Sequence, residues 1–122
     1  MKINHLIELK QNGHEIGIHG MNHLRWGTLN LEGQQNEIIS SYSYLKDKKL
    51  LDSDFSCCYP WGSYDQTTIK ILKEINCKLA LTSALGEFTN LKKDFFYKLP
   101  RFDTNDLPQS ILHKAEDYKQ AL

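Results

Sequence analysis

Two histidines, His19 and His23, lie four residues apart in the segment GHEIGIHGMNH, which covers residues 13–23. Neutral imidazole nitrogens are common ligands of zinc, and catalytic zinc sites keep one coordination position open for water. The pair could therefore supply half of a metal site. Surface or capping histidines are the alternative explanation. His14 would leave the expected strand on its opposite face, which favours a structural role for this residue.

An aromatic loop, YPWGSY, covers residues 59–64. It could be only a turn that ends a strand, which would explain its proline and glycine. Aromatic faces also stack on sugar rings, so Tyr59, Pro60 and Trp61 are candidate substrate-binding residues. The backbone N–H of Trp61, which follows a proline, could donate to a developing oxyanion.

Arg101 lies in the segment KLPRFD, residues 98–103, where the end of a strand is expected. It could be an exposed charge paired with a nearby aspartate, or it could bind a carboxylate through two parallel hydrogen bonds. Three aspartates are further candidate metal ligands, although a cap or turn explains each of them equally well. They are Asp65, Asp94 and Asp103.

Composition narrows the class of protein. The 122 residues suit a single domain, residues 1–122, and 15 basic residues balance 15 acidic ones, which disfavours a nucleic-acid partner. Three cysteines without Cys-x-x-Cys spacing, Cys57, Cys58 and Cys77, favour reduced and mostly buried thiols. We find no signal peptide and no apolar run long enough to span a membrane, so we expect a cytoplasmic protein.

Helices and strands are expected to alternate along the chain. The expected helices cover residues 3–11, about 31–51, 65–75 (beginning at Asp65 or Thr67) and 106–121. The expected strands cover residues 15–19, 55–59, 78–83 and 95–102. This order predicts an α/β fold with a mainly parallel sheet covered by helices. Functional groups gather beyond the carboxyl ends of such strands, so His19, His23, the aromatic loop and Thr82-Ser83 should meet at one edge.

The second helix has the clearest signals. Asn30 is expected to cap it, and Ile38, Tyr42 and Leu45 should face the core. On the same helix, polar side chains are expected to face water: Glu37, Lys46 and Lys48.

Taken together, these motifs resemble those of the polysaccharide deacetylases, carbohydrate esterase family 4, also described as the chitooligosaccharide deacetylase homology domain. The segment GHEIGIHGMNH, with Leu29 and the helix containing Glu37-Ile38, resembles the second motif, a GHEIGSH…H run. Residues 55–65, FSCCYPWGSYD, resemble the third motif, the YPYG-Y loop. Leu79–Ser83 and Leu99-Pro100-Arg101 match the strands that follow.

The resemblance implies a metal-dependent hydrolase that removes acetyl groups from N-acetyl amino sugars or O-acetyl glycans and is built on an irregular (β/α) barrel. His19 and His23 would hold a divalent metal, expected to be zinc. The Trp61 N–H would stabilise the oxyanion, Tyr59, Pro60 and Trp61 would line the substrate site, and Arg101 would orient the base.

The resemblance is not complete. The family's TFDDG motif, which supplies the proton-accepting aspartate and the metal aspartate, is not found in these residues and would precede Ile3. Gly20 replaces a serine or threonine, and Cys58 replaces an arginine that Arg101 could substitute. Ile111-Leu112-His113 resembles the last motif only superficially and is expected to be structural.

The resemblance therefore implies the C-terminal portion of a deacetylase domain, a partial barrel missing its first strands. A missing N-terminal segment or a homo-oligomer would have to complete the site. Two alternatives remain open: an inactive carbohydrate-binding module that keeps the aromatic loop, and a homodimer bridged by a metal on four histidines.

Overall fold

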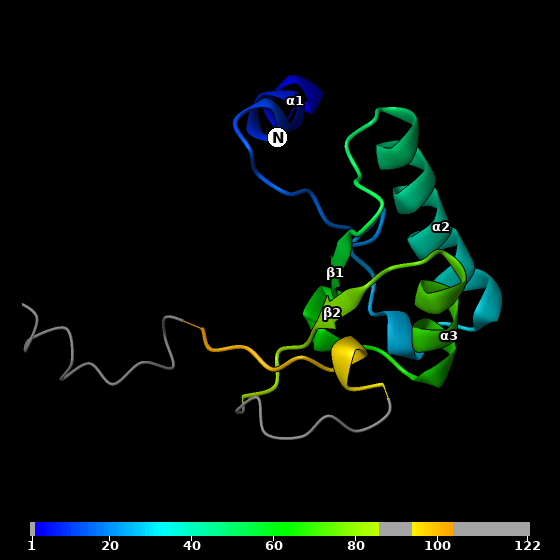
Figure 1. Ribbon diagram of the computed structural model, residues 1–122. Coiled ribbons are helices and arrows are strands. Elements are labelled where there is room, and N and C mark those ends of the chain that lie inside the picture. The colour runs from blue at the N-terminus through cyan, green and yellow to red at the C-terminus, as the bar shows by residue number, and fades with distance from the viewer. Residues whose placement is uncertain (1, 86–93, 104–122) are drawn as a thin grey trace, which may run out of the picture.

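The computed structural model describes residues 2–85 and 94–103 (Figure 1). Its α-helices are α1 (Ile3–Gln11), α2 (Leu31–Asp47) and α3 (Gln66–Glu74), and its strands are β1 (Ser56–Cys58) and β2 (Leu79–Leu81). Its short 3-10 helices are η1 (Trp26–Thr28), η2 (Pro60–Gly62) and η3 (Phe95–Tyr97). Among these residues, no helix has the length and apolar character that crossing a membrane requires.

Four segments of the chain lie side by side in parallel. Strands β1 and β2 pair with Cys57 opposite Ala80. Ile18 forms a parallel bridge to Cys57, and Leu99 forms one to Leu81 on the other side. The predicted parallel α/β arrangement is therefore confirmed in the described residues.

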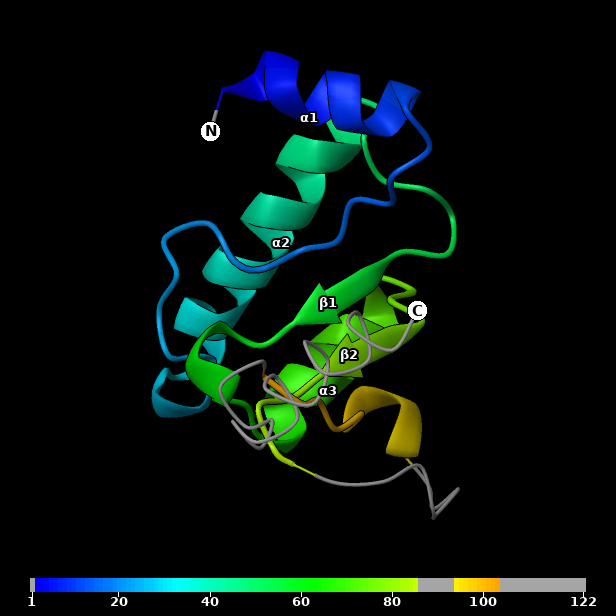
Figure 2. The same ribbon diagram turned by 90° about the vertical axis from the view of Figure 1, so that its left-hand side faces the viewer.

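Helices α2 and α3 pack on one side of the two strands, whereas α1 stands apart from the sheet (Figures 1 and 2). The core between the sheet and these helices contains mostly apolar side chains. Its members include Ile18, Trp26, Ile38, Phe55, Cys57, Tyr59, Ile71, Leu72, Cys77 and Ala80. No residue of α1 is buried. All three cysteines are free thiols, and Cys57 and Cys77 are buried, as predicted.

Capping side chains mark the first residues of α2 and α3. The Asn30 side chain accepts a hydrogen bond from the Gly33 N–H at 2.9 Å, as predicted for the start of α2. Asp65 caps α3, which begins at the next residue. Helix α2 ends at Asp47 rather than near Leu51, because Lys49 adopts a left-handed backbone conformation with φ of 57°.

Two predicted strands are wrong. Residues 15–19 contribute only the bridge at Ile18, with hydrogen bonds from Ile18 N–H to Ser56 O and from Cys58 N–H to Ile18 O. Residues 95–102 begin with the helix η3 and pair only at Leu99. Alternating apolar residues permit an extended chain, but pairing requires a neighbour whose hydrogen-bonding groups are in register. The predicted helix over residues 106–121 lies outside the described residues.

Candidate functional site

His19 follows directly from the Ile18 bridge, at the edge where β1 ends. Its Nδ1 lies 2.8 Å from the carbonyl oxygen of Cys58. Because a carbonyl oxygen can only accept, Nδ1 is the donor in this contact, and no hydrogen bond to Nε2 is found within residues 2–85 and 94–103. A histidine that binds metal typically makes this kind of second hydrogen bond, which fixes its ring and its tautomer.

His23 returns towards His19 through a tight loop. The centroids of the two imidazole rings are 4.8 Å apart. His23 has a φ of 58°, a conformation that residues other than glycine rarely adopt. The indole N–H of Trp61 donates to the His23 carbonyl oxygen at 3.1 Å, and the Trp61 and His23 ring centroids are 5.3 Å apart. The structure thus brings both predicted metal ligands and Trp61 together.

The carboxylate of Glu37 anchors the loop that carries His23. Its carboxylate accepts hydrogen bonds from the backbone N–H of Asn22, from the Asn22 side-chain amide and, at 3.3 Å, from the Leu24 N–H. The prediction that Glu37 faces water is wrong, since the residue is only 2% exposed. Burial raises the pKa of Glu37, but the hydrogen bonds from Asn22 and Leu24 outweigh it and leave the pKa below its usual value.

The aromatic loop divides into buried and exposed parts. Tyr59 and Pro60 are buried, and the Tyr59 hydroxyl donates to the Tyr97 carbonyl oxygen. Their side chains therefore belong to the core, and their binding to substrate stays a prediction. Trp61 is 60% exposed and has a left-handed φ of 59°. The guanidinium of Arg25 lies 4.8 Å from its ring centroid.

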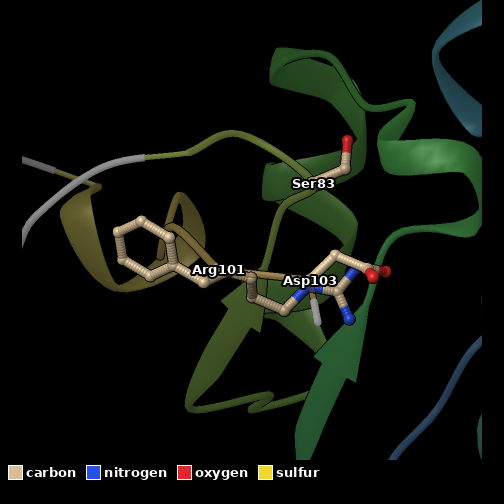
Figure 3. Close-up of a pocket in the computed structure, with 4 residues that line it drawn as sticks. Ser83, Arg101 and Asp103 are labelled. Carbon is tan, nitrogen blue, oxygen red and sulfur yellow. The ribbon is translucent and has the colours of Figure 1, made fainter. Parts of the chain in front are cut away.

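Arg101 lies beyond the ends of both strands. Its Nε donates to the Thr82 carbonyl oxygen at 2.7 Å, and its guanidinium reaches to 3.9 Å from the Cys58 sulfur. Together with His19 and Cys58 it borders an open hollow of about 340 Å³. A smaller pocket of about 140 Å³ adjoins it, and Figure 3 shows Ser83, Arg101 and Asp103 around that pocket.

The candidate carboxylate ligands lie elsewhere or have other partners. Asp65 accepts hydrogen bonds from Thr68 and Gln34, and these bonds lower its pKa despite the opposing effect of burial. Asp94 pairs with Lys73. Asp103 lines the small pocket with Arg101. Within residues 2–85 and 94–103, no three histidine, cysteine or acidic side chains are grouped to hold a metal ion.

The residues present fit two ligand positions of a metal site. The His19 ring is fixed through Nδ1, and its Nε2 has no hydrogen-bond partner among the described residues. The His23 ring is close enough to share one ion with it. A third ligand is not found in the described part of the chain. The predicted resemblance of Ile111-Leu112-His113 to a further motif lies outside the described residues.

The contacts of Glu37 with the loop that carries His23 were not predicted from the sequence. Gln34, Glu37 and Ser41 recur at helical spacing and are all buried, so they form a polar strip beside Ile38. The spacing was visible in the sequence, but polar residues at that spacing usually indicate a solvated face.

The described residues form an α/β fold with parallel strands, and His19 and His23 lie together where β1 ends. A family model described as polysaccharide deacetylase matches residues 3–80, and the chain belongs to that family. The chain also resembles a solved structure of the Streptococcus pyogenes deacetylase PplD in complex with acetate, with a TM-score of 0.76 and 25% sequence identity. The match covers 93% of this chain and 50% of that one, so this chain spans about half the length of PplD. No curated protein matches the sequence.

Proposed function

We propose that this chain is part of a metal-dependent deacetylase that hydrolyses acetyl groups on amino sugars or on O-acetylated glycans. The observation that carries the proposal is the His19 ring, which the Cys58 carbonyl holds through Nδ1 and which lies beside the ring of His23. Family membership supports the reaction class. We further propose zinc as the metal and an irregular (β/α) barrel as the complete fold.

Each residue of the site has a proposed task. His19 and His23 would hold the metal, which when bound lowers the pKa of water and polarises an acetyl carbonyl. The exposed ring of Trp61 would contact the sugar, and its backbone N–H would donate to the developing oxyanion. Arg101, anchored on Thr82, would orient a carboxylate that serves as base.

The described residues provide no third ligand beside the two histidines, and the proposed reaction also needs a carboxylate base. We propose that both are carboxylates of an Asp-Asp motif on a further segment or on a second chain. A protein built in this way would be active only when the two parts meet. The chain alone would then bind metal more weakly than the completed site does.

Calorimetric titration of zinc into the purified chain tests the proposal. We expect binding that is lost in His19→Ala and in His23→Ala. His14→Ala is the matched control, because His14 is an exposed histidine of the same segment that lies outside the pair. Absence of zinc binding, or binding that both site variants retain, would contradict the proposal.

The mass in solution, measured with and without a chelator, separates the proposal from the metal-bridged dimer. The proposed site gives one zinc per chain and no change in mass. A four-histidine bridge would instead give one zinc per two chains and a halved mass on chelation. Glycan binding that survives both histidine substitutions but is lost in Trp61→Ala would favour a carbohydrate-binding module.

A further inference from the structure

The loop that carries His23 has little packing of its own. Residues 21–25 are all exposed, and Trp26, which follows them, is fully buried. Two left-handed residues, Gly20 with φ of 81° and His23 with φ of 58°, turn the chain back towards His19. For a residue other than glycine, such as His23, this conformation costs free energy and persists only where the surroundings impose it.

The carboxylate of Glu37 provides that constraint on both sides of His23. The Asn22 N–H lies 3.1 Å from each carboxylate oxygen, and the Asn22 side-chain amide lies 2.7 Å from Oε1. The Leu24 N–H donates to the other oxygen, Oε2. Because His23 lies between these two residues, the hydrogen bonds fix its backbone on either side.

The space around the carboxylate is filled. A Cβ atom added to Gly20 would lie 2.9 Å from Glu37 Oε2 and 3.0 Å from Trp26 Nε1. The Trp26 N–H faces the same carboxylate and contributes to the lowering of its pKa, although its geometry does not make a full hydrogen bond within the described residues. A carboxylate buried among donors holds its position better than an exposed one, because moving it would leave buried charge and N–H groups unpaired.

We propose that Glu37 is a positioning residue that sets the orientation of His23 relative to His19 and thereby the metal affinity of the pair. The inference rests on the proposed function, since it assumes that the pair binds a metal. It assigns a role to a helix residue that does not itself contact either imidazole. Losing a residue that orients a metal ligand typically lowers affinity about 10- to 100-fold.

The test compares the zinc affinities of the wild-type chain, Glu37→Gln and the control Gln34→Ala. Gln34 is a buried polar residue of the same helix whose hydrogen bonds go to Leu29, Asp65 and Thr68 and not to the histidine loop. We expect Glu37→Gln to bind zinc about tenfold more weakly. Gln34→Ala should keep the wild-type zinc affinity, even if its thermal unfolding temperature falls as much as that of Glu37→Gln.

A spectroscopic measurement separates positioning from stability. With Co²⁺ in place of zinc, the visible absorption spectrum should change in Glu37→Gln and stay unchanged in Gln34→Ala. If Glu37→Gln does not fold, Asn22→Ala serves instead, because it removes one donor of the same carboxylate from an exposed position. It should weaken zinc binding several-fold.

The outcomes distinguish the two proposals. If the wild-type chain binds no zinc, the proposed function fails and this inference fails with it. If the wild-type chain binds zinc and the Glu37 and Asn22 variants bind it equally well with unchanged spectra, the proposed function stands and the positioning role of Glu37 is overturned.

Discussion

At the scale of single residues, Gly62 decides how closely the Trp61 loop approaches the end of β2. A Cβ at this position would lie 2.0 Å from the Ser83 Oγ and 2.9 Å from the Ser83 Cβ. Gly62 also has a left-handed φ of 64°. Both features favour glycine here, one through close packing and the other through the backbone.

Replacing Gly62 with alanine should therefore destabilise the fold and displace Trp61. We expect a loss of about 2 kcal/mol or more in the free energy of unfolding, from backbone strain plus the clash with Ser83. Gly13→Ala is the control, because Gly13 has a φ of 85° but no atom within 4 Å of an added Cβ. Urea denaturation measures both variants, and equal losses would show that the clash is relieved without cost.

The site was predictable where residue type and spacing carry the information. His19 and His23 could be found from the sequence because few residue types bind zinc and their spacing suits one ion. The role of Glu37 could not be found in this way, because a carboxylate on a helix is expected to face water unless the donors that surround it are known. The burial of Tyr59 could not be predicted for a similar reason: it depends on Tyr64, on which its ring stacks, and on the distant Tyr97.

At the scale of elements, Asp65 both begins α3 and connects it to α2. Its carboxylate accepts from the Thr68 N–H at 2.9 Å, which caps the helix. It also accepts from the buried side-chain amide of Gln34 on α2. The Thr68 hydroxyl completes the network by donating to Gln34 Oε1 at 2.6 Å.

Asp65→Ala should therefore cost more than the loss of a cap alone. A missing cap costs about 1 kcal/mol. The side-chain amide of Gln34 would keep only the Leu29 carbonyl as an acceptor, and its buried N–H without the Asp65 partner adds about 1–3 kcal/mol. Asn30→Ala is the comparison, because the Asn30 side chain caps α2 through Gly33. Chemical denaturation that gave the same loss for both variants would contradict a linking role for Asp65.

Helices could be predicted better than strands, for a physical reason. Caps and apolar periodicity are local, so α1, α2 and α3 were placed to within a few residues. Pairing of strands depends on distant segments, and the stretches at Ile18 and Leu99 form one bridge each. The end of α2 was missed because the left-handed conformation of Lys49 has no sequence signal as clear as a glycine.

At the scale of the whole molecule, two carboxylates link folding to pH. The pKa values of Glu37 and Asp65 both lie below the usual values of 4.5 and 3.8. A carboxyl whose pKa is lowered by folding stabilises the folded state above its unfolded pKa. That stabilisation is lost as the pH falls through the folded pKa.

The two carboxylates should therefore contribute their full stabilisation at pH 7. This stabilisation should begin to fall below about pH 4.5 and should continue to fall as the pH is lowered further. Urea midpoints recorded between pH 7 and pH 3 measure the effect. Asp65→Asn should show a shallower fall, because one of the two carboxyls with a lowered pKa is absent. A profile as steep as that of the wild-type chain would exclude Asp65 as a contributor.

The contacts between Ile18 and Trp26 limit where this chain can tolerate an insertion or a deletion. Ile18 and Trp26 are both buried, and the residues between them include both histidines and the partners of Glu37. One inserted or deleted residue there would break these contacts together. By contrast, residues 13–15 are exposed and connect to α1, which has no buried residue. Related sequences should therefore vary in length before Ile18 and keep a constant length from Ile18 to Trp26.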